Sequence, residues 1–289
     1  KGIVVFNTPG ANANAVKELV LAALFLSSRK INAGIEWVKS LKGKGGEIPK
    51  LIEKGKSNFT GPEISGKKLG VIGLGAIGAQ VANDAHAIGM EVTGYDPFIS
   101  IQAAWSLSRA VHRADSLDSL LEESDYITIH IPLLPDTRNF INQETFVGRA
   151  RAALRRGLKA LGDGTVSCYA TDFPNEDLLG VENVIPIPHL GASTPESEDN
   201  CAAMASHQLR YYIETGNIVN SVNFPHCEMP KAEHLRITVA HRNVPNMVGQ
   251  ITSLLAAQNI NIANMMNKSR GNTAYTMIDI DGDAPAGLS

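Results

Sequence analysis

The sequence predicts an α/β protein whose main part is a doubly wound parallel sheet, followed by a smaller α+β module with the order βαββ. Apolar segments of strand length alternate with helix-like segments between residues 69 and 187, as in parallel strands joined by helical crossovers. From about residue 235 the order changes to a strand, a helix and two strands. The chain has 289 residues, of which 44% are hydrophobic, so it is long and apolar enough for more than one buried core.

The N-terminal part contains one strand-like and one helix-like segment. Residues 2–7 are apolar enough for a strand, which indicates that a domain begins before Lys1. Residues 15–29 are strongly apolar and contain neither Gly nor Pro, so they predict a long buried helix. We interpret the polar, Gly-rich stretch that follows, with its lysine-rich part at 39–56, as a solvated linker where the chain crosses between domains.

A glycine-rich loop, Gly73-Leu74-Gly75-Ala76-Ile77-Gly78, lies between a predicted strand at 69–72 and a helix-like segment. In this order Gly73 permits a tight turn, Gly75 lets the backbone approach a pyrophosphate, and Gly78 lets helix and strand pack closely. The N-terminus of the helix then binds the phosphates. The sequence therefore predicts a dinucleotide site formed by Gly73, Gly75, Ala76, Ile77 and Gly78.

A dinucleotide site of this kind also needs an acidic residue after the second strand, and the sequence has one. Asp96 follows the second predicted strand, 91–95, eighteen residues after Gly78. A carboxylate there accepts hydrogen bonds from the ribose hydroxyls and repels a 2′-phosphate. No Arg follows Asp96 closely. We therefore expect a nucleotide-binding domain of the Rossmann type that holds NAD rather than NADP.

Composition excludes several other classes of protein. The longest apolar run, 19–26, has eight residues, whereas a bilayer span needs about twenty, so we expect no membrane partner. The net charge of −3 gives no general attraction to nucleic acid, and we expect no such partner. The cysteines are odd in number and lack the spacing of metal ligands, so we expect no metal site and a reducing compartment, the cytoplasm.

Two further predicted strands each lead to a short motif. Residues 125–130 lead to His130-Ile131-Pro132-Leu133, with Thr137 shortly after. Residues 183–187 lead to Pro188-His189-Leu190-Gly191-Ala192-Ser193-Thr194, and a helix is predicted from about 195 to 215. Two more motifs are Asn7-Thr8-Pro9-Gly10-Ala11-Asn12 and Asp172-Phe173-Pro174-Asn175-Glu176.

In this order, with the glycine loop and Asp96, the motifs resemble the D-isomer-specific 2-hydroxyacid dehydrogenases. The resemblance covers nearly the whole chain and implies hydride transfer between NAD and carbon 2 of a small-molecule 2-hydroxy acid. It also implies contacts to NAD from a further set of residues. These are His130, Pro132, Thr137, Asp172, Gly191 and Ala192.

The chemistry of the reaction requires a group that takes the hydroxyl proton, and histidine titrates near neutral pH. His189 is the candidate, although a lone His-Gly pair would also suit a structural histidine at a strand end. By resemblance, the Glu176 carboxylate holds the imidazole tautomer and stabilises the imidazolium. Asp177 and Glu182 lie nearby in the sequence, and an ordinary surface loop would also explain these acids.

The family also has an arginine that clamps the substrate carboxylate, in an Asn-x-Ala-Arg-Gly motif after a buried strand. Residues 146–157 keep neither that strand nor that motif, and about a dozen residues of the pattern are absent. Arg151 is the best match and Arg149 the second, and an amphipathic helix with a basic face explains them equally well. Either the sequence omits a piece of chain, or the molecule has lost part of its nucleotide domain and is an inactive NAD-binding regulator.

By resemblance, Asn12 reaches the substrate from the start of the long helix, where it would also serve as an N-cap. Contacts to a substrate phosphate come, in the family, from a region that would precede Lys1.

The segments 236–241, 246–258, 261 onward and 275–279 resemble an ACT domain, a small amino-acid-sensing module whose complete form adds a helix and a strand after Ser289. By resemblance, His241, Asn243 and Asn261 bind an amino-acid effector such as serine, with Asn261 reaching across a domain dimer. A module without a ligand, kept for oligomerisation, is the alternative.

We therefore divide the chain as follows: parts of a flavodoxin-like substrate-binding domain at 1–15 and 200–225, an NAD-binding domain with interdomain helices at 16–199, a linker at 226–234, and a partial ACT module at 235–289. We expect a homodimer or homotetramer, because nucleotide domains of the family pair and an open sheet edge needs cover. The sensing module favours a dehydrogenase of serine synthesis acting on a phosphorylated substrate. The alternatives are a dehydrogenase or reductase for glycerate, lactate or glyoxylate.

Overall fold

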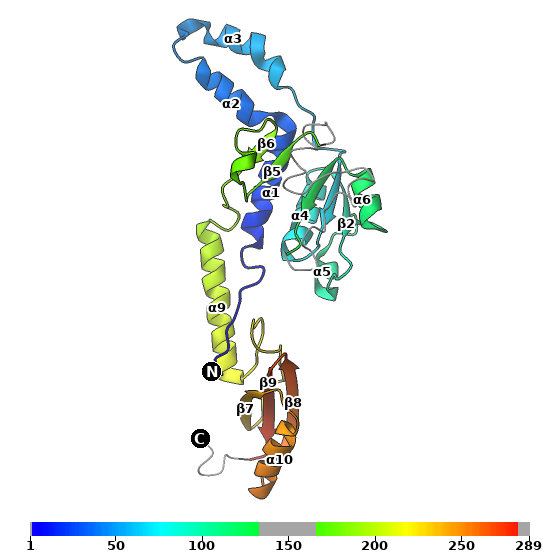
Figure 1. Cartoon of the computed structure of the whole chain (residues 1–289), viewed down its shortest axis with the longest axis vertical. Helices are drawn as coiled ribbons and strands as arrows, with labels where there is room; N and C mark the ends of the chain where they lie inside the picture. The colour runs from blue at the N-terminus through cyan, green and yellow to red at the C-terminus, as the bar shows by residue number, and fades with distance from the viewer. Residues whose placement is uncertain (1, 133–165, 283–289) are drawn as a thin grey trace. The chain divides into compact units, whose positions relative to one another are not determined.

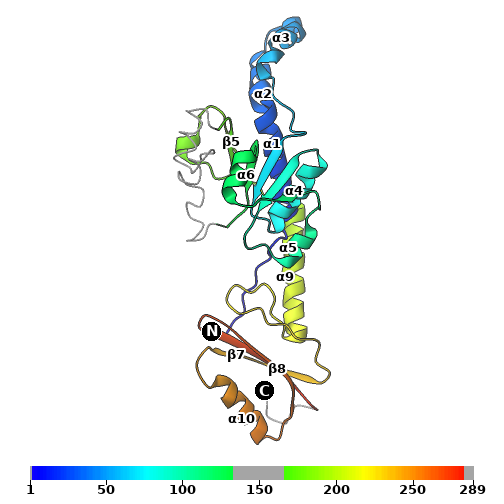
Figure 2. The ribbon, with the colours of Figure 1, turned by 90° about the vertical axis from the view of Figure 1, so that its right-hand side faces the viewer.

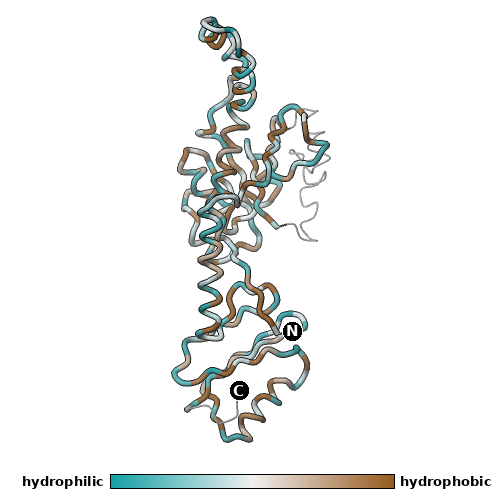
Figure 3. The backbone as a smooth tube through the Cα atoms, turned by 90° about the vertical axis from the view of Figure 1, so that its left-hand side faces the viewer, coloured by the Kyte–Doolittle hydropathy of each residue, from teal (hydrophilic) through white to brown (hydrophobic). Residues whose placement is uncertain are grey.

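The computed structural model describes residues 2–132 and 166–282, and the chain forms two compact units (Figure 1). The central unit runs from Asn12 to Ser197. The terminal unit combines the chain up to Ala11 with the chain from Glu198 onward. Hydrophilic and hydrophobic residues are interleaved along the helices (Figure 3), and among the described residues no helix is long and apolar enough to cross a membrane.

A four-stranded parallel sheet with the order β3-β2-β1-β4 forms the middle of the central unit (Figure 2). Its strands are β1 (Lys68–Ile72), β2 (Glu91–Tyr95), β3 (His112–Arg113) and β4 (Tyr126–Ile129). β1 is buried over four residues, as expected of a parallel strand covered on both faces. Ile72 pairs with Tyr95 and with Ile129, so the carboxyl ends of β1, β2 and β4 lie side by side. Sheets of this kind bind their ligands at that edge.

Helices cover both faces of this sheet. α1 (Ala13–Arg29) and α4 (Ala76–Ala87) share a core with Leu69 and Val71 of β1. α6 (Leu117–Glu123) packs on the opposite face, where its leucines meet Ile72. A short helix, α5 (Ile101–Ser106), follows β2. The predicted doubly wound parallel sheet is therefore confirmed.

The lysine-rich stretch is helical, so its interpretation as a linker is wrong. α2 (Ile31–Ser40) and α3 (Ile48–Gly55) are joined through the short turn η1 (Gly45–Glu47), and η2 (Lys56–Phe59) follows α3. Trp37 packs on Phe59 with ring centroids 5.2 Å apart. A Cβ added at Gly55 would overlap the Trp37 ring. At Gly55 the lack of a side chain thus permits close packing between α2 and α3.

Two more parallel strands, β5 (Tyr169–Thr171) and β6 (Val184–Pro186), pair with each other. In the part of the chain that the structure describes, they form a separate two-stranded sheet. The turn η3 (Glu176–Leu178) lies in their connection and buries Leu178. Because the strands are parallel, the loops after Thr171 and Pro186 leave the sheet at the same edge.

The terminal unit has the predicted βαββ order. Its elements are α9 (Pro195–Thr215), which starts in the central unit, β7 (Leu235–Arg242), α10 (Met247–Ala257), β8 (Ile262–Arg270) and β9 (Thr273–Ile280). The sheet is antiparallel with the order β7-β9-β8. Leu255 of α10 packs on one face with Ile278 and Ile280, and the other face buries Tyr275 and Met277.

Two segments of the terminal unit differ from the expectation. Cys227 and Met229, in the segment expected to be a linker, are buried in the core beneath Tyr275. The predicted opening strand is reduced to a single bridge between Phe6 and Ser221. Both segments contact residues that lie far away in the sequence, so the local sequence pattern does not reveal their structure.

Arg236 fastens the end of α9 to the sheet. Its Nε and Nη2 atoms donate to the two Asp279 carboxylate oxygens at 2.6 and 2.8 Å, and Nη1 donates to the Thr215 carbonyl at 2.9 Å. Nη2 also donates to the Pro230 carbonyl. The Arg236 side chain is 7% exposed, and the hydrogen bond to Asp279 raises its pKa.

Replacing Arg236 by Ala is expected to cost the terminal unit about 3 kcal/mol, because the Asp279 carboxylate and the Thr215 carbonyl lose their donors in a buried place. Hydrogen exchange of β7 and β9 measures this effect, with β1 of the same molecule as the internal reference. Arg210→Ala is the matched control, because Arg210 pairs with Glu214 on the surface and such pairs contribute little. Equal protection of β7 in both variants would contradict the prediction.

Candidate functional site

The glycine-rich loop joins the end of β1 to α4, and the structure requires glycine at positions 73 and 78. Gly73 has φ +88°, and an added Cβ would lie 2.9 Å from the His130 carbonyl oxygen. A Cβ at Gly78 would overlap the Gly73 carbonyl oxygen, so only glycine lets α4 start this close to β1. A Cβ at Gly75 would meet nothing within 4 Å. The surface at Gly75 is therefore open to a ligand.

α4 begins at Ala76 with Gly75 as its N-cap. The N–H groups of its first turn have no partner within the helix, and no side chain caps them. Ala76 is exposed, while Ile77 packs against the core shared by α1 and β1. A helix start of this kind, with a glycine on its open side, suits the pyrophosphate of a dinucleotide.

Asp96 lies at the carboxyl end of β2, beside this loop. One carboxylate oxygen accepts a hydrogen bond from Leu74 N at 2.9 Å, and the other accepts from Phe98 N at 2.9 Å. The side chain is half-buried, so it has room for further donors. The bond to Leu74, which sequence reasoning missed, ties the glycine-rich loop to β2 and fixes its position.

His130 and Pro132 follow β4 on the other side of β1. His130 N donates to the Ile72 carbonyl at 2.7 Å, and the ring Nε2 lies 2.9 Å from Thr128 Oγ1. Burial lowers the pKa of His130 to about 4, so the ring is neutral at pH 7. Its backbone borders Gly73, so His130 supports the turn of the glycine-rich loop.

His189 follows β6, and its loop is held at two places. Ile187 N donates to the Thr171 carbonyl at 2.8 Å, which aligns the chain before His189 with β5. Gly191 is buried, and an added Cβ would lie 3.2 Å from Val16 of α1. The His189 ring is exposed and contacts Phe173, with ring centroids 4.3 Å apart.

Two acidic residues of the candidate site, Asp172 and Glu176, lie in the loop after β5. Asp172 is half-buried directly after β5, and Glu176 is exposed at the start of η3. Between these described residues, no hydrogen bond or ion pair joins the Glu176 carboxylate to the His189 ring. The role of Glu176 stays a prediction.

Asn12 precedes α1, and its side chain makes no cap hydrogen bond; only its carbonyl accepts one, from Val16 N at 3.2 Å. The amide of Asn12 is thus not used in capping the helix. Three residues proposed from the sequence, Thr137, Arg149 and Arg151, lie outside the residues that the structure describes.

The three candidate effector residues lie at two ends of the terminal sheet. Near the β8–β9 turn, the His241 ring contacts Thr276 Oγ1 at 2.8 Å and the Asn243 amide donates to the Gly271 carbonyl at 3.0 Å. Asn261 lies at the other end of β9, where its amide donates to Asp281. One chain therefore does not bring Asn261 to Asn243, and their meeting across a dimer stays a prediction.

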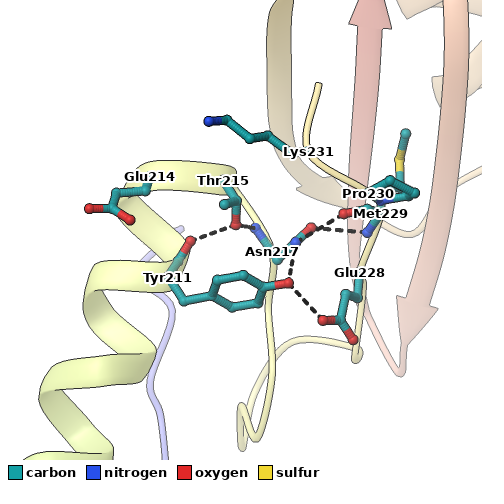
Figure 4. A pocket seen from close by; sticks show the side chains of 8 residues that line it. All are labelled: Tyr211, Glu214, Thr215, Asn217, Glu228, Met229, Pro230 and Lys231. Atoms are coloured by element: carbon teal, nitrogen blue, oxygen red, sulfur yellow. Dashed lines mark hydrogen bonds between the residues drawn. The ribbon is translucent and has the colours of Figure 1, made fainter. Parts of the chain in front are cut away.

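A surface hollow of about 540 Å³ lies in the terminal unit at the end of α9 (Figure 4). Its polar groups bond one another: Tyr211 donates to Glu228 at 2.7 Å, and the Asn217 amide donates to Tyr211 at 2.8 Å. The hydrogen bond to Glu228 also raises the pKa of Tyr211. Because these groups are satisfied within the protein, we assign no ligand to the hollow.

The chain belongs to the D-isomer-specific 2-hydroxyacid dehydrogenases. The model of their NAD-binding domain matches residues 21–191. Among curated relatives, D-3-phosphoglycerate dehydrogenase of Haemophilus influenzae is 30% identical over 97% of this chain and 70% of its own length. The enzyme of the same name from Methanocaldococcus jannaschii is 34% identical over 82% of this chain and 46% of its own. The curated relatives are longer, and the chain spans 46% to 71% of their lengths.

The chain is also similar to solved structures of dehydrogenases. The NAD⁺-bound 3-phosphoglycerate dehydrogenase of Entamoeba histolytica is 25% identical, with a TM-score of 0.57 over 76% of this chain and 68% of that one. The D-mandelate dehydrogenase of Rhodotorula graminis has a TM-score of 0.66 over 78% of this chain and 70% of that one, and at 19% identity it shows the fold alone.

The residues present fit the cofactor that the family implies. The open face of Gly75 and the first turn of α4 accept a pyrophosphate, and Asp96 stands where a ribose would follow. The prediction of an NAD-binding domain is confirmed by the family model.

Proposed function

We propose that this chain oxidises 3-phospho-D-glycerate to 3-phosphohydroxypyruvate with NAD, the first step of L-serine biosynthesis. One observation carries the proposal: relatives named D-3-phosphoglycerate dehydrogenase are about 30% identical over nearly the whole chain. The structure adds a cofactor loop and a histidine after β6 on the same central unit.

In this proposal bound NAD supplies the acceptor for the hydride from carbon 2 of the substrate. His189 accepts the proton of the 2-hydroxyl, so charge does not build up on the oxygen as the carbonyl forms. Glu176 stabilises the imidazolium, Arg151 holds the substrate carboxylate, and the free amide of Asn12 contacts the substrate. Asp96 holds the ribose, and the remaining contacts to NAD are those of His130, Pro132, Thr137, Asp172, Gly191 and Ala192.

The test is NADH formation, followed by absorbance, with 3-phospho-D-glycerate, D-glycerate, D-lactate and glycolate compared at equal concentration. We expect the highest kcat/KM for 3-phospho-D-glycerate. A higher value for an unphosphorylated acid would overturn the proposed substrate but keep the enzyme class. NAD binding in a calorimeter without turnover on any acid would overturn the enzyme and favour an NAD-binding regulator.

We further propose that the βαββ module of the terminal unit is an ACT domain that binds an amino acid such as serine. The position of His241 and Asn243 beside one turn supports this. In this structure the His241 ring bonds Thr276 and the Asn243 amide bonds the Gly271 carbonyl, so a zwitterion would replace these bonds. Titration with L-serine, and with L-alanine for comparison, tests the proposal, and an Asn243→Ala variant should bind less. We also propose a homodimer or homotetramer in the cytoplasm, which light scattering and cell fractionation would test.

A further inference from the structure

Phe173 contacts His189 in this structure. The two rings lie at a centroid distance of 4.3 Å and an interplanar angle of 46°. We propose that Phe173 is a positioning residue for His189: its ring holds the imidazole in the orientation needed to accept the substrate proton. The inference rests on the proposed function, in which His189 takes that proton.

Local structure explains why the two rings meet. Thr171, the last residue of β5, accepts two hydrogen bonds. Its Oγ1 accepts one from Phe173 N at 3.2 Å, and its carbonyl accepts the other from Ile187 N at 2.8 Å. The same residue thus fixes the turn that carries Phe173 and the end of the strand that leads to His189. The parallel register, with Thr171 opposite Pro186, brings both loops to one edge of the β5–β6 sheet.

The contact matters because little else fixes the imidazole. His189 is exposed, and within the described ranges its ring has no hydrogen bond or ion pair. An exposed histidine samples several side-chain rotamers unless packing selects one. Phe173 is itself 63% exposed, so burial in a core does not explain its position. Aromatic rings at this separation attract each other, and the pair restricts the rotamers of both side chains.

Leucine at position 173 would keep an apolar side chain but remove the ring. We expect Phe173→Leu to lower kcat about two- to tenfold, since part of the population then holds the imidazole in an unproductive rotamer. KM for NAD should not change, because the substitution alters only the side chain at 173 and leaves Asp172, the adjacent proposed NAD contact, in place. Phe173→Tyr keeps the ring and should therefore have the kcat of the unchanged protein. Thr171→Val, which removes the bond to Phe173 N, should lower kcat in the same direction.

The experiment combines kinetics with proton NMR of protein carrying ¹³C-labelled histidine. The His189 Cε1–H signal is assigned by its loss in His189→Ala, and in the unchanged protein the Phe173 ring current should displace it from the other histidine signals. We expect Phe173→Leu to move the signal and Phe173→Tyr to leave it displaced. Phe25→Leu, at a half-exposed phenylalanine of α1, is the matched control and should change neither signal nor kcat.

The outcomes separate the inference from the function on which it rests. A His189 signal that does not move in Phe173→Leu would overturn the contact. A signal that moves with unchanged kcat would overturn the positioning role. Absence of turnover in the unchanged protein would overturn the proposed function and the role in catalysis together, while the NMR signal would still report the contact between the rings.

Discussion

Replacing Gly78 by Ala is expected to weaken NAD binding strongly and to destabilise the central unit. The new methyl group would overlap the Gly73 carbonyl oxygen, a backbone atom that cannot rotate away, so α4 must move off β1. Overpacking of this kind costs about 1 to 3 kcal/mol, and occasionally more. The shift also misaligns the first turn of α4 with the open face of the loop, so we expect the Kd for NAD to rise at least a hundredfold. Calorimetric titration with NAD and a thermal unfolding scan measure the two effects.

Gly75→Ala is the matched control for this prediction. Its Cβ would meet nothing within 4 Å, and its φ of −71° suits alanine, so we expect the variant to fold with an unchanged Tm. The methyl group would nevertheless stand where the pyrophosphate approaches, so NAD should bind more weakly. We therefore expect Gly78→Ala to impair both the fold and NAD binding, and Gly75→Ala to impair NAD binding alone. Normal NAD binding by Gly78→Ala would refute the proposed arrangement of the loop.

Replacing His189 by Ala is expected to lower kcat for the proposed oxidation by about 10²- to 10⁴-fold, because the variant lacks the proposed acceptor of the hydroxyl proton. The Kd for NAD should remain the same, since the substitution removes only the His189 side chain and leaves Gly191 and Ala192, the proposed NAD contacts of the same loop, in place. Single-turnover absorbance of NADH measures the first quantity and calorimetry the second.

A histidine elsewhere provides the control for that experiment. His207 is exposed on α9 and stacks on Tyr211 with ring centroids 6.3 Å apart. We expect His207→Ala to keep both kcat and the NAD affinity. Turnover of His189→Ala within a factor of about three of the original would show that another group accepts the proton.

The sequence by itself determined the features that depend on local spacing. The glycine-rich loop, Asp96 at the end of β2 and the βαββ order after residue 235 were all predicted, and the structure contains each of them. Glycine at a fixed position can be predicted because a turn with φ +88° at Gly73 or a helix start against a carbonyl excludes every other residue. Thr137 and Arg151 stay predictions, since they lie outside the described residues.

Only the tertiary structure decided which distant residues meet. Asp96 bonds Leu74 N, Thr171 aligns Phe173 with the strand before His189, and Arg236 joins Asp279 to the end of α9. The lysine-rich stretch became a helical hairpin through Trp37 and Phe59, although its composition indicated a linker. These contacts join residues whose separation in sequence carries no periodic signal, so they depend on strand order and helix packing rather than on local propensity.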